Sequence, residues 1–213
     1  MYIDHFVWVA DDLFRETTRF ETIMGVKPIF GGIHEGRGTH NALLYLGHRC
    51  YLEVIAKDPD QSVRPWIMGE FPDDAGLIHW AWASEDLERD REKCLGAGWS
   101  LGKIEEGQRT RTDSSILSWK LTDPDVKAYD FQPFLIQWSS GFHPADSLAP
   151  ECQLQQITVF NSEGRLNQFG QLLHDRNYLK YQLGEPGLSL KVRTSSRVFI
   201  LKSGTNRISP AIP

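Results

Sequence analysis

Hydrophobic and polar positions along the first 140 residues follow an order that occurs twice. Residues 5–10 alternate under a bias toward β-branched and aromatic side chains, which predicts a strand. The apolar positions after it recur at helical spacing as far as Met24, and Asp11 or Asp12 can cap the start of this helix. Gly25 is expected to end it. Three further strands are predicted, at 27–31, 40–46 and 50–56.

The same order returns after residues 58–75, whose prolines mark them as a connection between two units. A strand at 77–83 is predicted to lead into a helix that Ser84 caps and that ends near Gly96. Three more strands are expected near 100–105, 115–121 and 132–138. Each unit is therefore predicted to be βαβββ, and together they form a paired domain over residues 1–140.

The sequence itself repeats along with this pattern. The segment His5-Phe-Val-Trp-Val-Ala-Asp-Asp-Leu13 aligns without a gap with His79-Trp-Ala-Trp-Ala-Ser-Glu-Asp-Leu87. A duplicated strand that opens on histidine offers one imidazole at the equivalent place in each unit. If a pseudo-twofold axis relates the units, the two imidazoles can converge on one point, so the repeat predicts a metal site between the halves.

A third, shorter unit is predicted over residues 150–213. The strand 155–160 precedes a helix at 163–174 with an apolar stripe, and Gln156 stands where the other units have histidine. Strands follow around 178–183, 188–193 and 197–202. Because this degenerate βαβββ-like unit lacks the histidine, we expect it to pack against the other two as a scaffold or to offer a contact surface.

Composition narrows the function classes only mildly. The 213 residues are 40% hydrophobic and 24% charged, as in an ordinary globular protein. The net charge is −5 and the basic residues are scattered, which argues against nucleic acid as a partner. No apolar run approaches a membrane span, and the first residues show no secretory signal. Three cysteines without metal-type spacing are expected to be reduced core thiols in a cytoplasmic protein.

Two further segments carry a family resemblance. Gly31-Gly-Ile-His-Glu-Gly-Arg-Gly-Thr-His-Asn41 is followed by Tyr51-Leu-Glu-Val-Ile55, between the two strands that open on histidine. Together with the duplicated βαβββ, these segments resemble the glyoxalase-like domain family of the vicinal oxygen chelate (glyoxalase/bleomycin resistance/dioxygenase) superfamily. The resemblance covers residues 1–140 and implies an α+β fold in which two tandem units form a cup-shaped open barrel.

The resemblance also implies inward-pointing metal ligands on the first and last strand of each unit. Carried over by position, it selects His5 and Glu53 in the first unit and His79 and Gln137 in the second. A carboxylate and two imidazoles in apolar strands are costly to bury, and a divalent ion between them would remove that cost. The ligand types suit Fe, Mn, Zn or Ni alike. Hydrogen-bonded core histidines and a solvent-facing glutamate remain the alternative.

The glycine-rich segment is the candidate for substrate binding. Its glycines allow a close approach of the backbone to a ligand, and polar side chains project from the same short stretch. We expect His34 or His40, with Glu53, to act as acid or base. The expected substrate-binding residues are Gly32, Arg37, Thr39, Asn41 and Trp82. The alternatives are a β-bulged hairpin for the glycines and core packing for the tryptophan.

Two function classes follow. The first is a metal-dependent enzyme of lyase or isomerase type that acts on a small oxygenated metabolite, with dioxygenation less favoured because Gln137 replaces the glutamate that the family's catalytic pattern has there. The second is a metal-free protein that binds a small molecule, like the drug-sequestering members of the superfamily. Arg37, Arg109 and Arg111 could supply a basic pocket for ligand carboxylates. Two complete units suggest that the cup forms within one chain, as a monomer or in a homodimer.

Overall fold

The computed structural model describes residues 1–63, 76–123, 131–139, 142–161, 172–173, 177–204 and 207–211. Within these ranges it holds two α-helices, one 3₁₀ helix and thirteen strands, which confirms the α+β class. Neither described helix has the length and hydropathy needed to cross a bilayer.

The first unit has the predicted βαβββ order. Its elements are β1 (Tyr2–Val9), α1 (Leu13–Met24), β2 (Ile29–His34), β3 (Thr39–Gly47) and β4 (Cys50–Lys57). Helix α1 begins where the Asp12 carboxylate accepts a hydrogen bond from the backbone N–H of Arg15, and it ends at Gly25 with φ of 72°. The left-handed conformation at Gly25 suits glycine because it has no Cβ to clash. Both predicted ends of this helix are confirmed.

The second unit repeats this order with shifted boundaries. It contains β5 (Gly76–Ala83), α2 (Leu87–Gly96), β6 (Ile104–Thr110), β7 (Ile116–Thr122) and β8 (Phe134–Trp138). The cap of α2 is Asp86, so the predicted cap at Ser84 is wrong; the Ser84 hydroxyl donates instead to the carboxylate of Asp90. The strand expected near 100–105 lies further along, because residues 101–103 lead into β6 without forming a strand.

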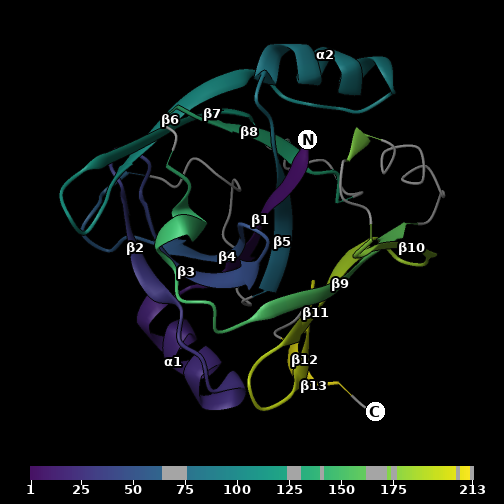
Figure 1. Cartoon of the computed structure of the whole chain (residues 1–213). Helices are drawn as coiled ribbons and strands as arrows, with labels where there is room; N and C mark the ends of the chain where they lie inside the picture. The colour runs from purple at the N-terminus through teal and green to yellow at the C-terminus, as the bar shows by residue number, and fades with distance from the viewer. Residues whose placement is uncertain are drawn as a thin grey trace.

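The eight strands of the two units close into one barrel in the order β1-β4-β3-β2-β6-β7-β8-β5. The first strand of each unit pairs in parallel with the last strand of the same unit. The units meet along β1 and β5, and again where β2 and β6 share the single pair Ile33↔Thr110. Figure 1 shows this ring with α1 and α2 outside it. The tandem arrangement of two units, which the family resemblance implied, is thereby confirmed.

Alternation along the strands divides the barrel into an inner and an outer face. The inner apolar cluster consists of Val7, Val9, Ile55, Ala81, Trp119, Leu121, Phe134 and Ile136. The outer cluster is larger and extends under both helices and the C-terminal unit. Neighbours of the inner residues, such as Phe6 and Trp8 on β1, therefore belong to the outer cluster.

The C-terminal unit is a five-stranded sheet in the order β10-β9-β11-β12-β13. Its strands are β9 (Gln153–Asn161), β10 (Leu179–Leu183), β11 (Gly187–Arg193), β12 (Val198–Lys202) and β13 (Arg207–Pro210), and the 3₁₀ helix η1 (Pro144–Ser147) precedes them. Sequence reasoning did not anticipate β13. Nearly all of the helix predicted at 163–174 lies outside the described residues.

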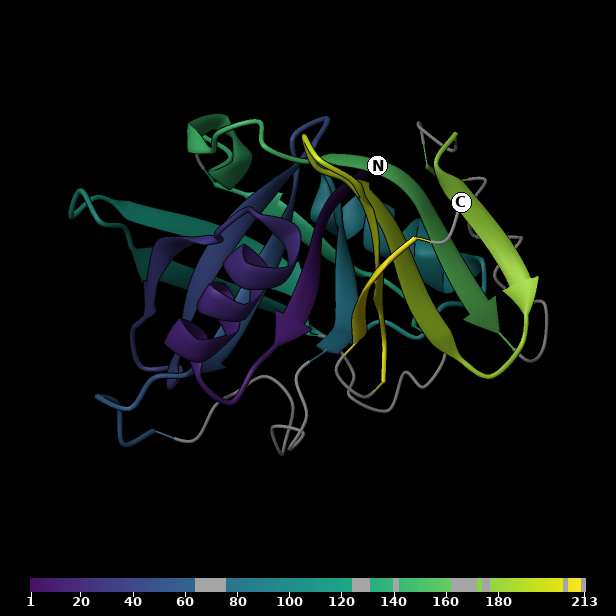
Figure 2. The ribbon, with the colours of Figure 1, turned by 90° about the horizontal axis from the view of Figure 1, so that it is seen from below.

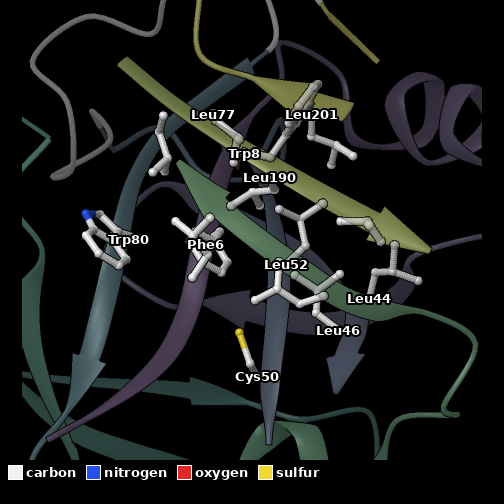
Figure 3. Packing of buried hydrophobic residues seen from close by; sticks show 14 of the residues in the cluster. Phe6, Trp8, Leu44, Leu46, Cys50, Leu52, Leu77, Trp80, Leu190 and Leu201 are labelled. Carbon is white, nitrogen blue, oxygen red and sulfur yellow. The ribbon is translucent and has the colours of Figure 1, made fainter. Parts of the chain in front are cut away.

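This sheet packs against the outer face of the barrel beside β1 and β5 (Figure 2). Leu190 on β11 and Leu201 on β12 belong to the same buried cluster as Trp8 and Leu52 of the barrel (Figure 3). The contact removes apolar barrel surface from water, which stabilises the fold in proportion to the area covered. The C-terminal unit thus packs on the paired units, as the scaffold prediction requires.

Candidate functional site

A small cavity lies inside the barrel among polar residues of both units. Its volume is about 40 Å³, which is room for roughly three water molecules by the usual measure of about 10–15 Å³ each. Its lining residues are His5, Val7, His34, Asn41, Tyr51, Glu53, Ile55, Arg109, Trp119, Leu121, Phe134, Ile136 and Trp138. One carboxylate, two imidazoles and one guanidinium therefore face a largely apolar space.

A bulge in β1 places a buried carboxylate beside His5. The pairing of β1 with β5 shifts register between Ile3 and His5, so Asp4 is an extra residue without a partner on β5. Its Oδ1 lies 2.6 Å from His5 Nδ1. Since the carboxylate can only accept, His5 Nδ1 carries the hydrogen, and in the neutral ring Nε2 then carries the lone pair on the cavity side.

Asp4 also joins the barrel to the segment after β8. Its Oδ2 accepts hydrogen bonds from Trp138 Nε1 at 2.9 Å and from His143 Nε2 at 3.1 Å. His143 Nδ1 accepts from the backbone N–H of Ala145, which leaves Nε2 as the donor. Hydrogen bonds from both histidines hold the pKa of the fully buried Asp4 well below its usual range, against the opposing effect of burial. Asp4 is therefore a fixed negative charge that orients His5.

Glu53 on β4 is the only carboxylate among the described residues that line the cavity. Its Oε2 lies 3.6 Å from His5 Nε2, and its Oε1 lies 3.7 Å from His34 Nε2. The amide of Asn41 donates to Oε1 at 2.6 Å. The side chain is 12% exposed, so this carboxylate stands between two imidazoles with little access to bulk water.

His34 at the end of β2 is held by two neighbours on β3. Its Nδ1 lies 2.8 Å from Thr39 Oγ1, and its Nε2 lies 3.3 Å from Asn41 Nδ2. Because the amide nitrogen of Asn41 can only donate, Nε2 is the acceptor and Nδ1 carries the hydrogen. Burial lowers the pKa of His34 to about 4, with Glu53 opposing that shift. At neutral pH the ring is uncharged and turns a lone pair toward the cavity.

Arg109 on β6 brings a positive charge from the second unit. Its Nη1 donates to Asn41 Oδ1 at 3.0 Å, so Asn41 links the guanidinium to Glu53. This contact needs a glycine at position 31, where a Cβ would lie 2.5 Å from the guanidinium and 2.6 Å from the Asn41 oxygen. Burial lowers the pKa of Arg109, although arginine remains charged over the whole accessible range.

The second histidine of the repeat, His79, also points into the barrel, since its partner Val7 does. The Phe134 ring contacts both histidines of the repeat edge-on, with ring centres 5.5 Å from His5 and 6.1 Å from His79. Burial lowers the pKa of His79 to about 4, and its Nδ1 has no hydrogen-bond partner among the described residues. The structure thus brings His5 and Glu53 together with His34, and leaves His79 without a polar contact in the described ranges.

Gln137 and Trp82 are among the predicted site residues that lie outside the barrel interior. The inward positions of β8 are Phe134, Ile136 and Trp138, so Gln137 points outward; it accepts from the backbone N–H of Leu87 and donates to the carbonyl of Glu85. Gln137 thereby fixes the start of helix α2. Trp82 is fully buried in the outer cluster, where its ring packs against Trp80 and Trp99.

The glycine-rich segment is a β-hairpin with a bulge, and its polar residues divide between two faces. Gly31 is the unpaired residue, and Gly32 has φ of 146° with a Cβ position only 2.3 Å from the carbonyl oxygen of Thr110. A glycine is therefore needed at position 32, because any Cβ there would clash with β6 where the two strands pair. Thr39 and Asn41 face inward with His34, whereas His40 packs edge-on against Phe30 on the outer face.

Of the three arginines considered for a basic pocket, only Arg109 lines the cavity. Arg37 donates to the backbone carbonyl of Glu106 outside it. Arg111 lies over the Phe142 ring, with 4.0 Å between the guanidinium carbon and the ring centre. Alternation alone would place Arg111 on the same face as Arg109, but β6 ends at Thr110, so Arg111 lies beyond the strand and turns away from the cavity.

The residues present suit a divalent ion in their chemistry. Two imidazole nitrogens and a carboxylate oxygen are ligands that Fe, Mn, Zn and Ni accept, and in each histidine the other nitrogen is held by a neighbour. The buried Nδ1 of His79 adds a nitrogen with no partner in the described ranges. The described part of the chain nevertheless contains no group of three His, Cys, Asp or Glu side chains already close enough to enclose an ion.

Sequence reasoning missed Asp4, His143 and Arg109 as members of one network with the predicted residues. Strict alternation places Asp4 on the face opposite to His5, and only the bulge brings the two side chains together. His143 follows β8 in irregular structure, where no periodicity applies. The acidic residue directly before the strand-opening histidine is the one sequence signal that could have indicated this arrangement.

Comparisons with known proteins agree with this architecture. The family model described as a glyoxalase-like domain matches residues 3–169. The structure of a hypothetical protein from Staphylococcus aureus has a TM-score of 0.61 at 14% identity, over 98% of this chain and 88% of that one. A methylmalonyl-CoA epimerase from Streptomyces coelicolor in complex with 2-nitronate-propionyl-CoA has a TM-score of 0.46 at 16% identity, over 66% of this chain and 99% of that one. No curated protein sequence matches significantly.

Proposed function

Since this chain belongs to the glyoxalase-like domain family of the vicinal oxygen chelate superfamily, we propose that it is a metal-dependent enzyme of lyase or isomerase type. Its substrate is a small oxygenated metabolite that enters the barrel cavity. One observation carries the proposal: Glu53 stands between the Nε2 atoms of His5 and His34, and the other nitrogen of each ring is fixed by a neighbour. Such a constellation is preorganised for polar chemistry in a water-poor site.

In this proposal His5, His34 and Glu53 hold the ion. When bound, the ion acts as a Lewis acid on an oxygen of the substrate. Asp4 keeps the hydrogen of His5 on Nδ1, so the Nε2 lone pair of His5 is available. Thr39 does the same for His34, whose Nε2 would exchange its hydrogen bond from the Asn41 amide for the ion. The lowered pKa of His34 serves the same purpose, because a neutral ring binds metal without first losing a proton.

Proton transfer falls to Glu53, since no other carboxylate among the described residues lines the cavity. A carboxylate oxygen of Glu53 takes a proton from the substrate carbon next to the substrate oxygen. It then returns the proton to the same carbon or to a neighbouring atom of the substrate. Asn41 holds Glu53 Oε1 by a hydrogen bond and leaves Oε2 facing His5. The apolar wall formed by Val7, Leu121 and Ile136 excludes water from this transfer. His40 takes no part, because it lies on the outer face.

The proposal is tested by metal content, measured by mass spectrometry on untagged protein reloaded in turn with Fe(II), Mn(II), Zn(II) and Ni(II). We expect about one ion per chain in the parent protein, because His5, His34 and Glu53 together form a single site. The variants His5→Ala, His34→Ala and Glu53→Ala should lose it. His40→Ala is the matched control and should keep it, because it removes an imidazole on the outer face of the same hairpin.

Two results would change the assignment. Loss of the ion in His79→Ala with retention in His34→Ala would move the ligand set to the two histidines of the repeat. Absence of stoichiometric metal under every loading would remove the metal-dependent mechanism altogether.

A metal-free binding protein is the second candidate, and the composition of β8 favours it. The inward positions Phe134 and Ile136 are apolar, so this strand supplies no ligand where the family's catalytic pattern places one. Trp119 and Trp138 line the same cavity and could report ligand binding by fluorescence. Quenching by a small apolar ligand in metal-free protein, without turnover, would support this function over the enzyme.

A further inference from the structure

The guanidinium of Arg109 is an unusual group to find inside the barrel. Arg109 is 4% exposed, and Asn41 Oδ1 is its one side-chain hydrogen-bond partner among the described residues. Within the same residues no carboxylate forms an ion pair with it. A guanidinium has five N–H donors, and a buried charge without a counter-charge is costly unless a ligand supplies one.

The two negative charges nearby are already engaged. Asp4 accepts from His5, His143 and Trp138, and Glu53 accepts from Asn41. With both carboxylates ionised, Arg109 charged and the proposed divalent ion in place, the site carries one net positive charge. A ligand with a single negative charge would balance it in a low-dielectric interior, where such balance matters most.

We propose that Arg109 binds the carboxylate of the substrate, and that the substrate is a small monocarboxylic acid with an oxygen on the carbon beside the carboxylate. This inference rests on the proposed function and names the class of molecule that the same site takes. Arg109 is a binding residue here, and its fork of donors matches the two oxygens of a carboxylate.

The spacing within the site sets where the substrate oxygen on the carbon beside the carboxylate would lie. One amide group, that of Asn41, separates the guanidinium from Glu53, with 3.0 Å on one side and 2.6 Å on the other. A molecule bound through its carboxylate to Arg109 therefore presents its neighbouring carbon to the His5, His34 and Glu53 cluster. An oxygen on that carbon meets the cluster, and a hydrogen there is within reach of Glu53.

The walls limit the rest of the molecule. The cavity volume of about 40 Å³ favours the smallest acids, and even an acid of the size of lactate requires the lining side chains to move apart when it binds. The rest of the lining is largely apolar and includes Val7, Leu121 and Ile136, so a short alkyl substituent suits it and a second charged group does not.

The experiment compares charged and uncharged forms of one molecule on the unmodified protein. Binding of lactate and of pyruvate is followed by tryptophan fluorescence, beside lactamide and pyruvamide, with the protein both metal-free and reloaded with Zn(II). We expect the amides to bind roughly 10- to 100-fold more weakly, as a hydrogen bond to a charged partner contributes about 1.5–3 kcal/mol. Equal binding of acid and amide, or binding of neither acid in either state, would overturn the inference.

Substitution of the arginine provides the second arm. Arg109→Gln should reduce lactate binding by the same roughly 10- to 100-fold factor, and Arg111→Gln should leave it unchanged, because Arg111 lies over Phe142 outside the cavity. Circular dichroism identifies a variant that fails to fold, in which case the comparison of acid with amide decides alone. Lactate binding that depends on Arg109 in a protein that never holds metal would keep this inference while the metal-dependent mechanism failed.

Discussion

At the scale of single residues, the site depends on side chains that hold other side chains. Asp4 fixes the hydrogen of His5, Thr39 fixes that of His34, and Asn41 connects Glu53 with Arg109. Each of these contacts sets which atom donates and which accepts. The chemistry of the cavity is therefore decided by residues that need not touch a ligand themselves.

Gly31 allows the most crowded of these contacts, and its replacement gives a sharp test. In Gly31→Ala the new Cβ would lie 2.5 Å from the Arg109 guanidinium and 2.9 Å from the Leu43 side chain. We expect loss of the Arg109–Asn41 hydrogen bond and about 1–3 kcal/mol of destabilisation, measured by urea unfolding. Gly96→Ala is the matched control, since nothing lies within 4 Å of its Cβ position; equal stability of the two variants would contradict the packing described.

At the scale of secondary-structure elements, local sequence signals set the ends of a helix, whereas pairing between distant strands sets where a bulge lies. Helix α1 follows its local signals closely, with Asp12 at its start and Gly25 at its end. The bulge in β1 has no comparable local signal, whereas the glycines of β2 already indicated a bulged hairpin as one alternative; the two bulges place Asp4 and Gly31 in the site. Helix α2 shows the intermediate case, because Asp86 rather than Ser84 caps it and Gln137 from β8 binds its first turn.

The cap of α1 can be tested with two neighbouring aspartates. Asp12→Ala removes the acceptor that binds the Arg15 backbone N–H at 2.7 Å, and should lower the free energy of unfolding by about 1 kcal/mol. Asp11→Ala removes only the ion pair with the Arg15 side chain, which is expected to contribute less than the cap because both side chains are exposed to solvent. Chemical denaturation of both variants beside the parent measures the difference. An effect of Asp11→Ala larger than that of Asp12→Ala would contradict the cap assignment.

At the scale of the whole molecule, the barrel keeps its polar groups in a largely apolar interior, and the C-terminal sheet packs on its outer face. Leu190 and Leu201 of that sheet complete the outer cluster around Trp8 and Leu52. Burial in this interior also lowers the pKa of histidine side chains. His34 and His79, from different units, both have pKa values of about 4 for this reason.

These two histidines predict how stability depends on pH. Their pKa values are below the ordinary value of about 6.5, so the unfolded chain binds protons that the folded chain does not. The stability is therefore complete above about pH 6.5 and falls as the pH is lowered toward 4, by about 3 kcal/mol for each histidine. Asp4, whose pKa is lowered, adds a loss only at still lower pH.

Urea unfolding of metal-free protein between pH 7.5 and 4.5 would measure this dependence, with His79→Gln as the variant in which the slope should roughly halve. A free energy of unfolding that stays constant over this range would show that the two rings are not buried in their neutral form.

The sequence by itself determined the duplicated βαβββ plan and the ends of α1. These features follow from periodicity, capping and repetition, which act over a few residues. Only the tertiary structure decided that His34 and Arg109 join Glu53, that Gln137 binds α2, and that Asp4 reaches His5. Each of these contacts depends on strand register or on a bulge, and register is set by pairing between segments far apart in the chain.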